Sequence, residues 1–93
     1  MQKLTDAEIQ QALGGLSGWS LEGGEFVQQR TFKDFVAAMH FVNRVAELAE
    51  PAGHHPDIDI RYNRVRLALV THDSGGITEN DVSMARKIND LAA

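Results

Sequence analysis

The sequence predicts one α+β domain in which a four-stranded antiparallel sheet carries helices on one face. Its 93 residues suffice for one hydrophobic core and no more. Apolar residues recur at helical spacing in three segments of the chain. In four other segments, polar and apolar residues alternate or β-branched residues form a short run. The resulting order, α-β-β-α-β-β-α, lacks the regular alternation of strand and helix that is typical of a parallel doubly wound sheet.

A first helix is expected from about Asp6 to Leu13. Residues 5–8, Thr-Asp-Ala-Glu, have the form of a capping box, and apolar residues follow at spacings of three and four until a glycine pair ends the helix. Residues 19–21 and 26–31 are predicted as two strands of a hairpin, because Gly23-Gly24 between them favours a turn.

A long amphipathic helix is expected next, ending near Glu50-Pro51. Its apolar positions recur every three or four residues and are Phe32, Phe35, Val36, Met39, Val42, Val45, Ala46, Leu48 and Ala49. Either Thr31 or Asp34 is expected to cap its start. This helix should supply much of the core, since burying one large apolar side chain stabilises a fold by roughly 1.5 to 3 kcal/mol.

A second hairpin is predicted from residues 57–62 and 65–70, with Asn63-Arg64 as its turn. If Tyr62 pairs with Val65, the numbers of opposed residues add to 127, and His55 is expected to face His72 at the open end. Alternation then assigns Ile58, Ile60, Tyr62, Val65, Leu67 and Leu69 to the core face, and Asp57, Asp59, Arg61, Arg66, Ala68 and Val70 to the other face. A final helix is expected after residues 78–81, which offer a capping-box variant.

The composition excludes several classes of protein. A chain without cysteine has no disulfide scaffold, iron–sulfur cluster, thiolate zinc site or cysteine nucleophile. The formal net charge is −4 and the nine basic residues do not cluster along the sequence, so direct binding to nucleic acid or to an acidic membrane is not expected. Neither a signal peptide nor a membrane-spanning run of 18 apolar residues is visible, which favours a cytoplasmic location.

Three histidines are the candidate chemical groups. His54 and His55 precede the second hairpin and His72 follows it, while Glu50 can approach the same place from the end of the long helix. An imidazole titrates near neutrality, so histidines around a pocket can donate a proton to a leaving hydroxyl and accept another from the same substrate. The pattern therefore predicts acid/base chemistry that needs no cofactor.

Two other interpretations of the histidines stay open. Four histidines in 93 residues also fit scattered structural roles, and His, Asp and Glu are common metal ligands. A metal site is the less favoured interpretation, because adjacent histidines on an extended chain point in opposite directions and no H-x-x-x-H spacing occurs. His40, within the long helix, is expected to be a packed or half-exposed structural residue.

One set of motifs, spread over residues 50–81, is typical of a known protein family. It consists of Glu50-x-x-x-His54-His55-Pro56, then Tyr62-x-x-Val65, then Thr71-His72-x-x-x-Gly76-x-Thr78-x-x-Asp81. These motifs resemble the signature of the pterin-4a-carbinolamine dehydratase family. The capped first helix, Trp19 and the aromatic-rich long helix also match that family's layout, so the resemblance spans essentially the whole chain. It implies an α+β sandwich with a four-stranded antiparallel sheet and helices on one side, in agreement with the element order.

The resemblance implies an activity. The family dehydrates 4a-hydroxytetrahydropterin to quinonoid dihydropterin, which regenerates the pterin cofactor after an aromatic amino acid hydroxylase has used it. His54, His55 and His72 fall on the family's active-site histidines, some of which protonate the departing hydroxyl while another group helps to remove the N5 proton. Neither a cofactor nor a metal is implied, and a homodimer or homotetramer is expected.

The same resemblance assigns pterin-binding positions, namely Glu50, Gly53, Val70, Thr71 and Asp73. Glu50 matches an acidic position near the pterin. Two positions depart from the family: Gly53 replaces an acidic residue of animal members, and Asp57-Ile58 stands where many members have an acidic residue followed by Trp. Pterin orientation or affinity is therefore expected to differ. Asp81 fits both a site residue and a helix cap, and the cap is favoured.

A binding or assembly protein is the competing interpretation. By resemblance, animal relatives also act as dimerisation cofactors for a transcription factor, and some bacterial relatives look like assembly factors for a carboxylating enzyme. Members that have abandoned catalysis would be expected to lose site histidines, and this chain retains all three, so an enzyme is favoured. Action on another pterin, such as a molybdopterin precursor, is a third interpretation.

Overall fold

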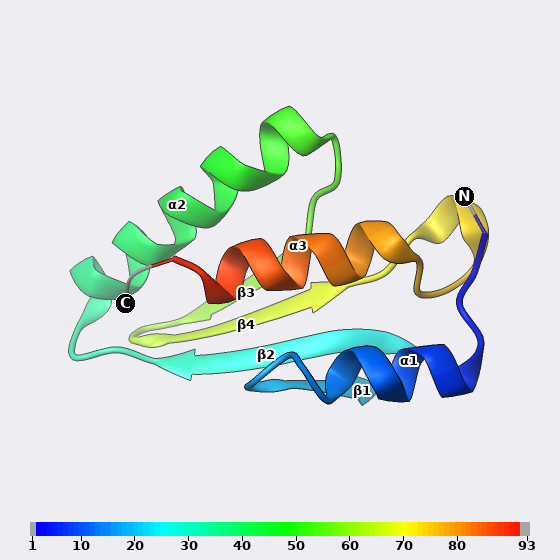
Figure 1. Ribbon diagram of the computed structural model, residues 1–93. Helices are drawn as coiled ribbons and strands as arrows, with labels where there is room; N and C mark the ends of the chain where they lie inside the picture. The colour runs from blue at the N-terminus through cyan, green and yellow to red at the C-terminus, as the bar shows by residue number, and fades with distance from the viewer. Residues whose placement is uncertain (1, 92–93) are drawn as a thin grey trace.

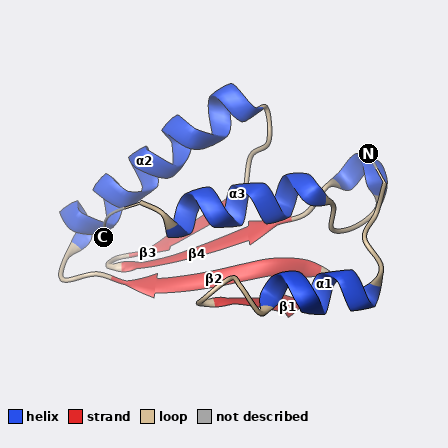
Figure 2. Ribbon diagram, in the orientation of Figure 1, coloured by secondary structure: helices blue, strands red, loops and turns tan. Residues whose placement is uncertain are grey.

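The computed structural model describes residues 2–91 and confirms the predicted order of elements (Figure 1). The helices are α1 (Asp6–Leu13), α2 (Phe35–Ala52) and α3 (Glu79–Asn89), and the strands are β1 (Trp19–Glu22), β2 (Glu25–Thr31), β3 (Asp57–Arg61) and β4 (Arg64–Leu69). The strands form one antiparallel sheet in the order β1-β2-β4-β3, and the helices lie on one side of it (Figure 2). A short 3₁₀ turn, η1 (His72–Ser74), lies between β4 and α3 and was not predicted.

The helix starts are set by side-chain caps. Both predicted capping boxes form, at residues 5–8 and 78–81. At α2 the cap is Asp34 rather than Thr31, because the Asp34 Oδ1 accepts a hydrogen bond of 2.8 Å from the Ala37 N–H. The helix therefore begins at Phe35, three residues after the first apolar position of the predicted stripe.

The core lies between the sheet and the helices. Buried side chains of the strands include Phe26, Val65, Leu67 and Leu69, and those of the helices include Ile9, Ala38, Phe41, Val45, Val82, Ala85 and Ile88. The buried stripe of α2 is narrower than its apolar stripe, so Phe35 and Val36 are exposed. His40 is exposed as well, so of the two expected placements, packed or half-exposed, the packed one is excluded.

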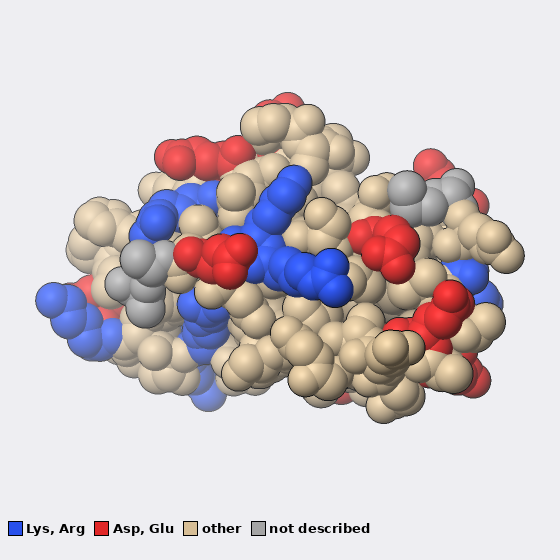
Figure 3. All heavy atoms as spheres, viewed as in Figure 1, with Lys and Arg blue, Asp and Glu red and all other residues tan. Residues whose placement is uncertain are grey.

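Acidic and basic side chains are interspersed on the face seen in Figure 3, and neither sign covers it. None of the described helices is long and apolar enough to cross a membrane.

The predicted register of the second hairpin is wrong by two residues. Ile58 faces Leu67 and Ile60 faces Val65, so the numbers of opposed residues add to 125. The turn consists of residues 62–63 rather than 63–64. A shift of two residues keeps the strand side chains on their predicted faces, because the side-chain period of a strand is two. Tyr62, predicted on the core face, lies in the turn instead, and both Tyr62 and Ile58 are exposed rather than buried in the core.

The cause of the shift lies in the turn itself. Tyr62 adopts a left-handed conformation with φ of 52°, whereas a turn at Asn63-Arg64 would have required such a conformation of Asn63. Asn63 is bound to Phe32 twice, because its Nδ2 donates to the Phe32 carbonyl at 2.7 Å and its own carbonyl accepts from the Phe32 N–H at 2.8 Å. The predicted opposition of His55 and His72 is therefore wrong, and both residues lie outside the strands.

A polar network joins the C-terminal end of α3 to the first hairpin. The Asn89 Oδ1 accepts hydrogen bonds of 3.0 Å from the Trp19 Nε1 and from the Gln28 Nε2, while its Nδ2 donates to the Ser17 carbonyl at 3.0 Å. The Gln28 Oε1 accepts a bond of 2.8 Å from the Arg30 Nε. Buried side-chain polar atoms of the described residues all have hydrogen-bond partners, and this network supplies several of them.

Arg30 also stacks on the core. Its guanidinium carbon lies 4.5 Å from the centre of the Phe41 ring, a cation–π arrangement. Burial lowers the pKa of the Arg30 guanidinium from its usual value, but arginine stays charged at neutral pH.

Replacing Asn89 with alanine is expected to lower the free energy of unfolding by about 2 to 4 kcal/mol, because the buried donors of Trp19 and Gln28 would lose their acceptor. Urea unfolding followed by circular dichroism measures the change. Lys87→Ala on the same helix is the matched control, since Lys87 is exposed. Equal stability of the two variants would contradict the importance of the network.

Candidate active site

His54 is positioned by the end of α2. Gly53 ends the helix in a left-handed conformation with φ of 63°, which favours glycine. The His54 N–H then donates to the Ala49 carbonyl at 3.3 Å, so the chain leaves α2 in a fixed direction. This conformation gives a physical reason for glycine at position 53.

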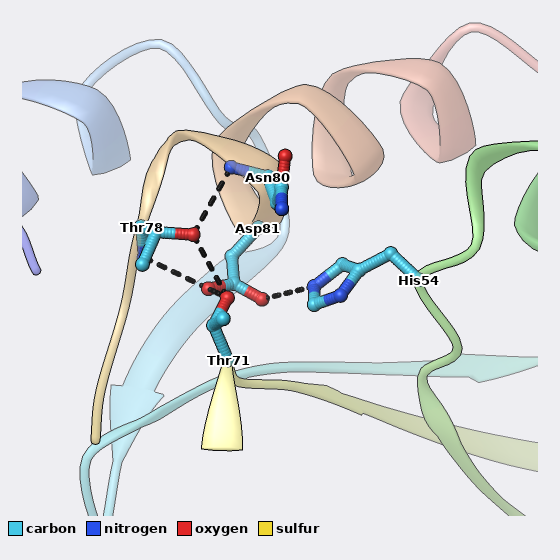
Figure 4. A network of polar contacts seen from close by, with 5 residues as sticks. All are labelled: His54, Thr71, Thr78, Asn80 and Asp81. Atoms are coloured by element: carbon cyan, nitrogen blue, oxygen red, sulfur yellow. Dashed lines mark hydrogen bonds and ion pairs between the residues drawn. The ribbon is translucent and has the colours of Figure 1, made fainter. Parts of the chain in front are cut away.

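His54 is paired with a buried carboxylate. Its Nε2 lies 2.6 Å from the Oδ1 of Asp81, in the first turn of α3 (Figure 4). The His54 side chain is 14% exposed and the Asp81 side chain is fully buried. Asp81 was interpreted as a helix cap rather than a site residue. The structure shows that it does cap α3, since its Oδ2 accepts from the Thr78 N–H at 2.9 Å, and that its other oxygen holds His54.

Two threonines complete the surroundings of Asp81. The Thr71 hydroxyl donates to the Asp81 Oδ2 at 2.8 Å, and the Thr71 and Thr78 hydroxyl oxygens are 2.8 Å apart. Asp81 thus faces a backbone N–H, a hydroxyl and an imidazole, a set of donors that suits a carboxylate. Because a carboxylate only accepts, the His54 Nε2 carries the hydrogen of their bond, and the Nδ1 is the ring nitrogen left for another molecule.

The neighbouring histidine is paired separately and lies in solvent. The His55 Nε2 is 2.9 Å from the Glu50 Oε2, with the two side chains 61% and 82% exposed. Such an exposed pair adds little to stability. Its effect is to hold the His55 ring towards the end of α2.

The third histidine lies on the loop that follows β4. Thr71 and Gly76 form a bridge, with the Thr71 N–H donating to the Gly76 carbonyl at 3.0 Å, and this bridge closes the loop around η1. His72 and Asp73 are exposed in η1, and Val70 is partly buried before it. His72 therefore lies one residue from the Asp81 network through Thr71.

The structure thus divides the predicted site residues into groups. His54 and Thr71 meet at Asp81, His55 meets Glu50, and His72 and Asp73 stand exposed on the adjoining loop. Across residues 2–91, no group of three or more His, Asp or Glu side chains is arranged to hold a metal ion. This arrangement holds the His54 imidazole in place through its Nε2, and no hydrogen bond to its Nδ1 is formed within residues 2–91. The other two imidazoles, of His55 and His72, are exposed.

Comparison with known proteins gives this arrangement its context. The sequence profile of the pterin 4 alpha carbinolamine dehydratase family matches residues 2–91. The chain belongs to this family. A relative from Acidobacterium capsulatum that bears the pterin-4-alpha-carbinolamine dehydratase name is 59% identical over 91 residues, covering 98% of this chain and 99% of the relative.

Solved structures of dehydratase-like proteins agree with the fold. The crystal structure of a transcriptional coactivator/pterin dehydratase from Brucella melitensis superimposes with a TM-score of 0.94 at 39% identity, covering 99% of this chain and all of that one. A pterin dehydratase-like protein described as a RuBisCO assembly factor in the alpha-carboxysome matches with a TM-score of 0.65 at 21% identity, over 77% of this chain and 86% of that one. At that identity the second likeness concerns the fold alone.

Proposed function

We propose that this chain catalyses the dehydration of a 4a-hydroxytetrahydropterin to quinonoid dihydropterin and water, as a step in the recycling of a tetrahydropterin cofactor in the cytoplasm. The observation that carries the proposal is the buried Asp81, which holds the Nε2 of His54, while the Nδ1 has no hydrogen-bond partner among residues 2–91. Membership of the family supports the class of substrate. Retention of His54, His55 and His72 supports catalysis over binding alone.

The reaction needs two proton transfers and no redox step. The C4a–O bond breaks as the hydroxyl takes up a proton and leaves as water, the N5–H bond breaks, and a C4a=N5 double bond forms. A rigid imidazole with one free nitrogen can serve as acid or base at one of these atoms, and an exposed imidazole such as His55 or His72 can serve at the other. Glu50, Gly53, Val70, Thr71 and Asp73 are the proposed pterin-binding positions.

The competing function is a binding role without catalysis. It is favoured by one specific observation, since the Brucella structure is described as a transcriptional coactivator as well as a pterin dehydratase. A binding protein would have no need of a carboxylate buried behind a histidine, so the Asp81–His54 pair favours the enzyme.

A coupled hydroxylase assay tests the proposal. Purified chain is added to an aromatic amino acid hydroxylase reaction, and the absorbance of the 4a-hydroxytetrahydropterin is followed with and without it. The carbinolamine is expected to disappear faster than in the spontaneous reaction. An unchanged rate at micromolar protein would favour the binding role.

The same assay after treatment with EDTA tests the expectation that no metal takes part. Turnover should be unchanged, because the proposed proton transfers use imidazoles alone. Loss of activity that zinc restores would overturn this part of the proposal.

A further inference from the structure

Three arginines gather on the outer face of the sheet, which faces away from the helices. Arg61 is the last residue of β3, and Arg64 and Arg66 alternate along β4. Their side chains point outward because the residue between the two β4 arginines, Val65, is only 1% exposed in the core. The basic residues do not cluster along the sequence, but the fold brings these three together, which corrects the expectation of no basic cluster at this place.

The charges of this arginine cluster are incompletely balanced. Arg61 and Arg64 are directly opposed across the two strands, an arrangement of like charges that is destabilising on its own. The Arg61 Nε lies 3.3 Å from the Asp59 Oδ1, and the Arg66 Nη2 lies 3.9 Å from the Glu22 Oε1.

Within residues 2–91, Arg64 has no ion-pair partner. Its neighbours across the strands are Thr31 on β2 and Arg61 on β3, and neither is acidic.

A shallow hollow lies at the cluster. It has a volume of about 200 Å³ and is lined by Gln29, Asp59, Arg61, Arg64 and Arg66. A water molecule takes up about 30 Å³ in the liquid, so the hollow has room for roughly six of them and therefore for a group of the size of phosphate. Its lining carries three positive charges and one negative charge, a net +2 on a chain whose formal charge is −4.

We propose that this hollow binds the phosphate group of a small molecule. A phosphate monoester carries a charge of about −1.5 to −2 at neutral pH, opposite in sign to the net charge of the lining. The planar guanidinium also presents paired N–H donors that fit two phosphate oxygens at once. Arg64 is the expected principal contact, because Arg61 and Arg66 are already paired with carboxylates.

The proposed phosphate site is separate from the candidate active site. Asp81 belongs to α3, which covers the inner face of the sheet, whereas the arginine cluster lies on the outer face near the β3–β4 turn. Failure of the dehydratase assay would therefore leave this proposal intact, and failure of phosphate binding would leave the proposed function intact.

An NMR titration tests the site. Sodium pyrophosphate is added to ¹⁵N-labelled protein at low ionic strength, since salt screens exposed charges. The amide signals of Gln29 and of residues 59–66 are expected to shift and saturate. Arg64→Gln should weaken the affinity by about tenfold or more, as expected for a lost charge-assisted hydrogen bond. Lys87→Gln on α3 is the matched control and should change it by less than about twofold.

A parallel titration with ADP distinguishes the source of the phosphate. Equal affinity for ADP and pyrophosphate would point to the phosphate group as the whole ligand, and tighter binding of ADP would point to a nucleotide. Two results would overturn the proposal: no shift at residues 59–66 with any of the phosphates, or an unchanged affinity in Arg64→Gln. Arg64 is exposed, and a thermal melt confirms that the variant is folded.

Discussion

Replacing His54 with alanine is expected to slow dehydratase turnover by about 10²- to 10⁴-fold, the usual worth of a positioned acid or base. His54 is the imidazole that the fold holds most firmly, because its Nε2 is fixed by Asp81 and its ring is largely enclosed. Replacing His72 is expected to reduce turnover within the same range, although His72 is exposed and its side chain has no hydrogen-bond partner in the described part of the chain.

His40→Ala is the matched control. His40 is exposed on α2, so its loss should change neither the turnover nor the free energy of unfolding by much. The rate is measured per folded molecule, with the spontaneous dehydration of the carbinolamine subtracted. Full turnover in a His54→Ala, His72→Ala double variant would refute the catalytic assignment and would favour the binding role.

Asp81→Asn is expected to reduce turnover by about 10- to 100-fold and to lower the free energy of unfolding by about 2 to 4 kcal/mol. Asp81 acts as a positioning residue, since one of its oxygens fixes the ring of His54 while the other caps α3 at Thr78. The amide of asparagine would place an NH₂ group, itself a donor, against one of the donors that now bond to the carboxylate. The imidazole would then be free to change its tautomer or its direction.

Glu8→Gln separates the two effects. Glu8 is the third residue of α1 and completes its capping box, as Asp81 does in α3, but it is exposed and forms no hydrogen bond with a histidine among the described residues. We expect this variant to lose about 0.5 kcal/mol of stability and to keep its turnover. Urea unfolding gives the stability, and single-turnover kinetics of the folded protein give the rate. Normal turnover in a destabilised Asp81→Asn protein would show that Asp81 caps α3 but does not position His54 for catalysis.

The local signals in the sequence sufficed for the seven helices and strands of the described residues and for the side of the sheet that most strand residues face, but not for η1 or for the turn at Tyr62. Capping boxes at residues 5–8 and 78–81 depend on groups three positions apart, and the alternation along β4 depends on a period of two. These signals act over a few residues, so they can be recognised without knowing the rest of the chain. They also placed Asp81 at the start of a helix, where it caps α3, but they did not predict its contact with His54.

The register of the second hairpin depended on a choice that local signals did not settle. Both possible two-residue turns keep the same faces, and the favoured one follows from hydrogen bonds between Asn63 and Phe32, which is 31 positions away. The expected opposition of His55 and His72 across the hairpin was built on that register, and the observed register does not produce it.

The tertiary structure alone decided which charged groups meet. His54 and Asp81 are 27 positions apart and come together because α3 packs over the sheet beside the end of α2, which buries the carboxylate and makes the imidazole its partner. Arg61, Arg64 and Arg66 form a cluster only because a tight turn folds β3 back on β4. The sequence by itself determined which chemical groups the protein contains and which helices and strands carry them. Which of these groups are buried, and which lie close enough to interact, is decided only when the chain folds. Burial and distance therefore decide what the groups can do.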